Sequence, residues 1–294
     1  MKNLREIFHP SKITLSGKST IVDTESGKYV IKDKNKDIKS LFAYLDSRAF
    51  NNYPDIVDEY DNKLIYEYID DINIPVNQKA SDMANLLSNL HYKTSHYIPI
   101  VKDDIKEIYE NIEGNILYFE NYYNRIYTLA ENEEFMRPSY YLLIRNQSKI
   151  NALIKFLKDE LEKWYKETIN KEKTRVVYNH NNLSLDHYRN AKKDYFISWD
   201  NYKVDTPVLD LINLYHNDFT KYDFSNFLSS YLKKFSLLPE EKRLFFIVIS
   251  LPKVTYFNDN EMDNTIAIGK FIDYINNTEK LIRPYYIEEN GSNY

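Results

Sequence analysis

The hydrophobic pattern of this chain changes its period near Gln78, and that change limits the folds open to the chain. Before this point, β-branched runs alternate with Ser-Gly and Glu-Ser-Gly turns, as in strands joined by hairpins. Only the segment 37–50 has apolar residues at helical spacing. After Gln78, apolar residues recur every three or four positions, apart from short strands at 174–182 and 194–200. The pattern predicts an α+β protein, with a small antiparallel β-rich part that carries one helix and a larger, mainly helical part.

Local signals refine this prediction. Asp61 and Asn62 indicate a turn between two short strands. Ser81 has the side chain and position of an N-cap for the first helix after the change of period. Gly114 is expected to interrupt or end a helix within 103–135. The segment 148–168 places apolar residues along one stripe, which predicts an amphipathic helix.

Composition excludes several classes of function. The chain has 294 residues and no cysteine, so disulfides, thiolate metal sites and cysteine nucleophiles are excluded. Its net charge of −5 argues against general nucleic-acid binding, which needs a basic surface. The longest apolar runs, such as 244–251, are too short to span a bilayer, and no hydrophobic region follows the charged start. We therefore expect a cytoplasmic protein with neither a nucleic acid nor a membrane as its partner.

Four short motifs stand out along the chain: YVIK at Tyr29–Lys32, LIYEYI at Leu64–Ile69, LLSNLH at Leu86–His91 and HNNLSLDH at His180–His187. A strand-like YFIS and an aspartate, Asp210, follow the last motif. Alone, each motif has an ordinary structural explanation, such as an edge lysine, a packed strand or a buried histidine. In their order and spacing they resemble the aminoglycoside phosphotransferase and choline kinase family, distant relatives of the protein kinases.

The resemblance covers most of the chain and implies a two-lobed protein kinase-like fold. Residues 1–70 would form a β-rich, nucleotide-binding lobe. Residues 71–294 would form a helical lobe that contains a catalytic-loop-like segment at 178–200. ATP or GTP with Mg²⁺ and a small hydroxylated molecule would then bind in the cleft between the lobes.

The resemblance also implies roles for single residues. Lys32 would contact the α- and β-phosphates of the nucleotide. The backbone of the hinge, at Glu67, Tyr68 and Ile69, would meet the adenine ring. His180 would open the catalytic loop, and the later Asp210 matches the family's structural aspartate.

Several positions depart from the family's pattern. Asn182 stands where a carboxylate would accept the substrate proton, and an amide cannot take up a proton at neutral pH. His187 and Ser198 stand at the two metal-binding positions, although magnesium prefers oxygen ligands. The helix after Lys32 has no partner glutamate and carries Ser40 near the expected position.

Three hypotheses stay open. Asp186 and Asp200 could form a relocated acidic site, provided that an extended segment turns Ser198 and Asp200 the same way. The chain would then be an active, atypical small-molecule phosphotransferase. If both aspartates only close turns, it is a catalytically degenerate kinase fold that binds a nucleotide or a small ligand, which the departures favour. A structural module whose tyrosine-rich helices bind a protein partner is the third hypothesis.

Overall fold

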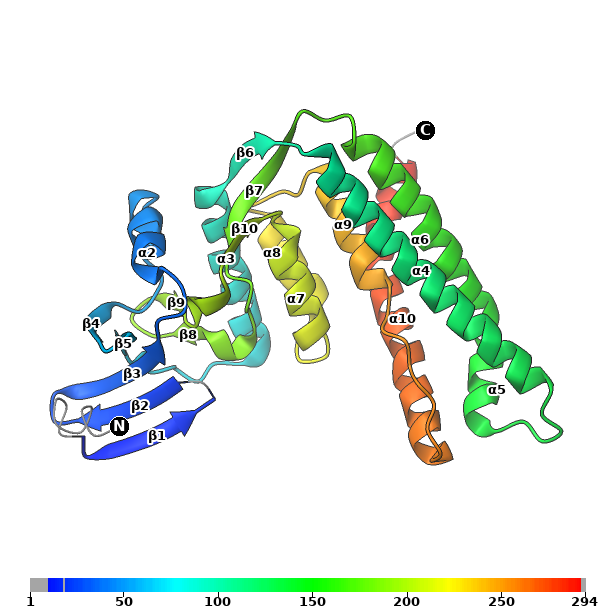
Figure 1. The fold of residues 1–294 in the computed structure, drawn as a ribbon, viewed down its shortest axis with the longest axis horizontal. Helices are drawn as coiled ribbons and strands as arrows, with labels where there is room; N and C mark the ends of the chain where they lie inside the picture. Colours follow the sequence, from blue (N-terminus) through cyan, green and yellow to red (C-terminus); the bar gives the residue numbers. More distant parts are fainter. Residues whose placement is uncertain (1–9, 18, 292–294) are drawn as a thin grey trace. The chain divides into compact units, whose positions relative to one another are not determined.

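The structure is a computed structural model and describes residues 10–17 and 19–291. The chain divides into two compact units, each made of two stretches of sequence. The first unit consists of Met1–His96 and Val177–Ser236, and the second of Tyr97–Val176 and Leu237–Tyr294. Figure 1 shows the strands near the N-terminus and the long helices of the second unit. The lobe boundary expected at residue 70 stays a prediction.

A five-stranded sheet forms the N-terminal part of the first unit (Figure 1). Its strands are β1 (Lys12–Ser16), β2 (Ser19–Thr24), β3 (Gly27–Asp33), β4 (Ile56–Tyr60) and β5 (Lys63–Glu67). They run antiparallel in the order β1-β2-β3-β5-β4. Asp61 and Asn62 have φ angles of 46° and 59°, the left-handed pair that a two-residue hairpin turn requires. The predicted turn is therefore confirmed.

One helix, α2 (Ile38–Ser47), connects β3 to β4. The Asp37 carboxylate caps it by accepting hydrogen bonds from the Ser40 backbone N–H at 3.2 Å and the Ser40 hydroxyl at 2.6 Å. Its apolar face is buried, as the spacing predicts; the buried residues are Ile38, Leu41, Phe42 and Leu45.

The rest of the first unit surrounds the loop at His180 with helices and very short strands. Its elements are α3 (Val76–Thr94), β8 (Tyr188–Asn190), β9 (Asp194–Phe196), β10 (Lys203–Asp205), α7 (Val208–Asp218) and α8 (Phe224–Leu232). Two strands, β6 (His96–Pro99) and β7 (Lys173–Asn179), contain residues of both units. β8 pairs with β9, and a three-stranded sheet has the order β10-β7-β6. Helix α3 packs against α8 and contacts β9. These contacts place the His180 loop on a helical base.

The second unit is a bundle of helices (Figure 1). Its members are α4 (Lys102–Glu131), α5 (Pro138–Arg145), α6 (Gln147–Thr168), α9 (Pro239–Ser250) and α10 (Glu261–Gly291). Aliphatic and aromatic side chains fill its core together, and the rings of Tyr123 and Phe271 stack with their centroids 5.0 Å apart. Helix α6 confirms the amphipathic helix predicted at 148–168.

Two local predictions are wrong. Ser81 lies inside α3, which begins at Val76 after Pro75, so Ser81 is no N-cap. Gly114 lies inside an uninterrupted α4. Packing of the apolar face of α4 outweighs the weak helix propensity of a single glycine.

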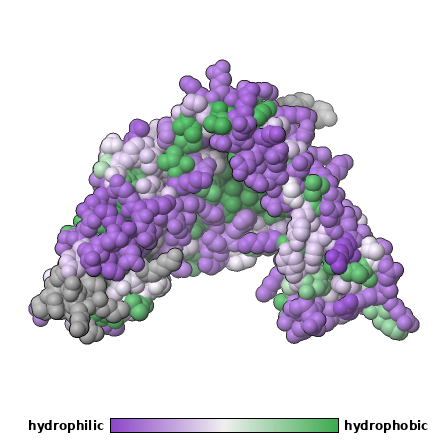
Figure 2. Space-filling view, viewed as in Figure 1, coloured by the Kyte–Doolittle hydropathy of each residue, from purple (hydrophilic) through white to green (hydrophobic). Residues whose placement is uncertain are grey.

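Hydrophilic residues cover most of the face drawn in Figure 2. In the part of the chain that the structure describes, none of the helices combines the length and the apolar character that a membrane crossing requires.

Candidate functional site

Lys32 contacts the segment that follows β9. It lies on β3, on the sheet face opposite the buried Ile31, because side chains alternate along a strand. Its ammonium group donates to Ser198 Oγ at 3.0 Å and lies 2.7 Å from Asp200 Oδ2. The lysine side chain is 14% exposed and the aspartate 30%, so water screens this ion pair only in part. Residues far apart in sequence thus meet at one ammonium group, as the resemblance implied for the lysine and this segment.

A tight turn aims both Ser198 and Asp200 at Lys32. Ser198 has a left-handed backbone, with φ 69° and ψ 52°, and a 3₁₀ turn at Trp199–Asn201 follows. The relocated acidic site required an extended backbone from Ser198 to Asp200, and the structure has a turn there instead. The two side chains nevertheless point to the same atom, because the turn reverses the chain within three residues.

No acid on α2 pairs with Lys32 among the residues that the structure describes. Asp37 is the N-cap of the helix, and Asp46 accepts a hydrogen bond from the Tyr53 hydroxyl group. Asp200 takes the place of the missing glutamate. Burial and the nearby Asp200 carboxylate raise the pKa of the Tyr66 phenol above its usual range.

His180 is buried, and its catalytic assignment stays a prediction. Its ring Nε2 lies 2.8 Å from the Ile197 carbonyl oxygen, and its ring centroid lies 4.7 Å from that of Trp199. Burial lowers the pKa of His180 to about 4, so the imidazole is neutral at physiological pH. Its Nδ1 is buried and has no partner among the described residues.

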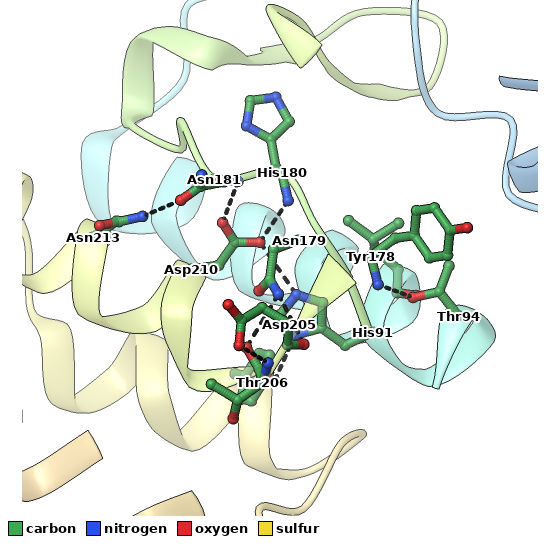
Figure 3. Close-up of polar contacts among 12 residues, drawn as sticks. His91, Thr94, Tyr178, Asn179, His180, Asn181, Asp205, Thr206, Asp210 and Asn213 are labelled. Carbon is green, nitrogen blue, oxygen red and sulfur yellow. Dashed lines mark hydrogen bonds and ion pairs between the residues drawn. The ribbon is translucent and has the colours of Figure 1, made fainter. Parts of the chain in front are cut away.

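Asp210 holds the start of the loop (Figure 3). Its buried carboxylate accepts the backbone N–H of His180 at 2.8 Å and that of Asn181 at 2.7 Å. Nε2 of His91 lies 3.3 Å from the same carboxylate, and Nδ1 of His91 lies 2.8 Å from the Tyr231 hydroxyl. Figure 3 shows the His180 ring pointing away from Asp210. Asp210 therefore has the structural role that the resemblance implied.

The remaining loop residues point to different partners. Asn182 accepts, through its backbone carbonyl, a hydrogen bond from Nδ1 of His187. Asp186 is exposed. The hydrogen bond that Lys221 donates to Asp218 raises the pKa of Lys221, and the Asp186 charge contributes to a smaller extent. The catalytic assignments of Asn182 and Asp186 stay predictions.

Two backbone N–H groups of the hinge already donate hydrogen bonds to carbonyl groups of the first unit. The N–H of Glu67 donates to the Asp55 carbonyl at 3.0 Å, and the N–H of Tyr68 donates to the Lys28 carbonyl at 3.2 Å. The N–H of Ile69 has no partner among the described residues. If the hinge binds a base, Ile69 supplies the donor, and this assignment also stays a prediction.

No family model and no curated protein matches the sequence. Solved structures do match. An aminoglycoside phosphotransferase from Alicyclobacillus acidocaldarius aligns with 95% of this chain and 92% of its own, at 9% identity and a TM-score of 0.68. An AMP-bound spectinomycin phosphotransferase aligns with 94% of this chain and 96% of its own, at 12% identity and a TM-score of 0.53. A choline kinase from Streptococcus pneumoniae covers 96% and 95%, at 14% identity and a TM-score of 0.48.

The chain has the fold of the aminoglycoside phosphotransferases. The predicted α+β, protein kinase-like fold is confirmed, because the alignments extend over nearly the whole of both chains. At 9% and 12% identity the likeness concerns the fold alone. The chemistry that this phosphotransferase fold supports here depends on its own side chains.

In this structure the side chains predicted to hold magnesium contact other groups. Magnesium takes oxygen ligands in octahedral geometry, and in kinase-like sites one or two carboxylates share the ion with water and substrate phosphates. The described residues contain no cluster of three or more His, Asp or Glu side chains that could hold a metal ion. Ser198 and Asp200 are both engaged by Lys32, and Nδ1 of His187 is engaged by the Asn182 carbonyl. The metal assignments of His187, Ser198 and Asp200 stay predictions.

Sequence reasoning missed the support that Asn181 gives to the loop. Asn181 has a φ of 57°; its side-chain oxygen accepts a hydrogen bond from Asn213 at 3.0 Å, and its amide donates to the Asn201 carbonyl at 3.1 Å. Two features of the sequence could have indicated this role of Asn181. Asparagine tolerates the left-handed region well, and Asn213 follows Asp210 by one helical turn.

Proposed function

We propose that this chain is a catalytically degenerate member of the aminoglycoside phosphotransferase and choline kinase family, which binds a nucleotide or a small hydroxylated ligand beside Lys32. The observation that carries the proposal is the Lys32–Asp200 ion pair at 2.7 Å. The lysine that the family uses for phosphates is in place, and the nearby Asp200 carboxylate neutralises it.

Binding is supported by the groups that remain. The Ile69 N–H, which has no partner among the described residues, is a hydrogen-bond donor for the edge of a base. The spectinomycin phosphotransferase with the same fold is an AMP-bound complex. A nucleoside or nucleotide is therefore the first ligand to test.

Loss of phosphoryl transfer is supported by the groups that have changed. Asn182 cannot act as a general base, and removing such a base typically slows a reaction by about 10²–10⁴-fold. Transfer from this scaffold also depends on metal ions that neutralise the developing charge. The described carboxylate at this point is Asp200, and it is paired with Lys32.

The second candidate is an active, atypical phosphotransferase. One observation favours it, since Asp200 places a carboxylate next to the phosphate-binding lysine. Asp186 would then supply the catalytic carboxylate. This candidate requires turnover that disappears in both Asp186→Ala and Asp200→Ala, measured as transfer of labelled phosphate to a panel of aminoglycosides and amino alcohols.

Thermal unfolding with ligands tests the proposal. We expect at least one of adenosine, AMP, ATP and GTP to raise Tm by about 4–5 °C at roughly one hundred times its dissociation constant, with EDTA present. No labelled phosphate should be transferred under the same conditions with magnesium added. Stabilisation by none of these ligands would leave the protein-interaction hypothesis, and magnesium-dependent transfer would favour the active enzyme.

A further inference from the structure

We propose that Asp200 occupies on Lys32 the place of a ligand phosphate, so that this site selects ligands of low charge, such as a nucleoside, over di- and triphosphates. The inference rests on the proposed function, because it assigns the ligand class of the same site. It makes Asp200 the residue that determines specificity.

The contacts of Lys32 carry the first step. A lysine ammonium has three donors and no acceptor. One donor is used by Ser198 Oγ at 3.0 Å, and the Asp200 carboxylate lies 2.7 Å away. A phosphate must displace the carboxylate or bind next to it, and like charges at a partly buried site repel each other.

The charges of the neighbourhood carry the second step. In a site that holds a metal, the metal neutralises an acidic ligand and leaves the lysine for the phosphate. Here the cation that lies against Asp200 is Lys32 itself, at 2.7 Å. The pair contributes no net positive charge to attract a polyphosphate.

Other nearby lysines have partners of their own. The ammonium of Lys34 lies in an ion pair with Glu59. That of Lys36 donates to the Tyr202 carbonyl at 2.8 Å and lies 4.9 Å from the centre of the Tyr202 ring. Lys18 lies outside the described residues. Among these described lysines, Lys32 is the one that the YVIK motif on β3 would direct to a phosphate. Its charge is neutralised by Asp200.

A simple structural role makes a different prediction. If the pair only ties the sheet to the turn at Trp199, then Asp200→Asn lowers stability and leaves the ranking of ligands unchanged. If Asp200 selects against charge, the same variant changes the ranking. The asparagine keeps the size of the side chain and can still accept a hydrogen bond from Lys32.

Calorimetric titration in EDTA distinguishes these roles. Adenosine, AMP and ATP are each titrated into the wild-type chain, into Asp200→Asn and into Asp33→Asn. Asp33 is a matched control, because it forms a 2.9 Å ion pair with Lys63 on the same sheet and its loss changes the net charge equally. We expect wild type to bind adenosine at least as tightly as ATP. Asp200→Asn should bind ATP roughly tenfold more tightly, as expected for one like charge removed at a partly screened distance, and leave adenosine within about twofold.

Each outcome has a clear meaning. Tighter binding of ATP in Asp200→Asn but not in Asp33→Asn supports the inference. Wild type that prefers ATP to adenosine without metal, or an Asp200→Asn variant with unchanged or weaker ATP binding, overturns the inference and leaves ligand binding standing. Binding of no probe to any of the three proteins overturns the proposed function and, with it, the inference.

Discussion

At the residue scale, the buried carboxylate of Asp210 fixes the loop that begins at His180. It accepts two backbone N–H groups and contacts His91, and it is fully buried. In Asp210→Asn, an amide N–H₂ faces one of these donors and leaves it without an acceptor. We expect the free energy of unfolding to fall by about 3 kcal/mol, measured by urea denaturation.

Asp186→Asn is the matched control for this substitution. Asp186 lies in the same loop and is exposed, so its replacement should change the free energy of unfolding by less than about 0.5 kcal/mol. Equal losses in the two variants would mean that the Asp210 contacts do not hold the loop.

His180 gives the protein a pH-dependent stability. Burial lowers the pKa of His180 from 6.5 to about 4. Below about pH 6.5 the unfolded chain therefore takes up a proton that the folded chain refuses, and this difference lowers the free energy of unfolding by about 2 kcal/mol by about pH 5. The loss is complete near the folded pKa.

Urea denaturation of wild type and His180→Gln at about pH 7 and about pH 5 measures this effect. Glutamine does not titrate, so wild type should lose about 2 kcal/mol more than the variant between the two pH values. Parallel losses in the two proteins would show that His180 is accessible to protons in the folded state.

The role of a residue could be predicted from the sequence only where the chemistry of its side chain decides that role. Asn182 cannot be a base in any fold, and Asp210 follows its motif at the expected distance. The partner of Asp200 could not be predicted, because it depends on the left-handed backbone of Ser198, a conformation unusual for serine. The missing helix glutamate was visible in the sequence, but its replacement was not.

At the scale of single elements, Gly114 offers a test of the continuous helix α4. A Cβ built on Gly114 meets no atom within 4 Å, so alanine fits without strain. Because alanine loses less backbone entropy on folding, Gly114→Ala should raise the free energy of unfolding by about 0.5–1 kcal/mol. Thermal unfolding measures the change.

Gly17→Ala is the matched comparison. Its Cβ also meets no atom within 4 Å, but Gly17 has a φ of 56°, where a side chain costs about 1–2 kcal/mol. This variant should be destabilised. Destabilisation of Gly114→Ala would instead indicate a break in α4 near this residue.

Elements were predictable where the local sequence signal was strong. The amphipathic α6 and the hairpin turn at Asp61 and Asn62 carry strong local signals. The strands β8, β9 and β10 have three residues each. Three residues are too few to show the alternation of apolar and polar side chains that identifies a strand. The start of α3 was missed because Pro75, and not Ser81, precedes its first turn.

At the scale of the whole molecule, the order of elements was enough to predict the kinase-like fold, which the comparison with solved structures confirms. The division into two compact units was not predictable, since each unit joins stretches that are distant in sequence. Contacts such as Lys32 with Asp200 depend on this long-range assembly. The sequence therefore indicated where a site could form, and the structure shows which charges meet there.

A crystal structure grown with ADP and excess magnesium chloride tests the central claim most directly. We predict that Asp200 stays within hydrogen-bonding distance of the Lys32 ammonium group and that no protein side chain coordinates a magnesium ion. An octahedral magnesium ion held by Asp200 together with Asn182 or His187 would contradict the account, because the fold would then have kept its metal site in a relocated form.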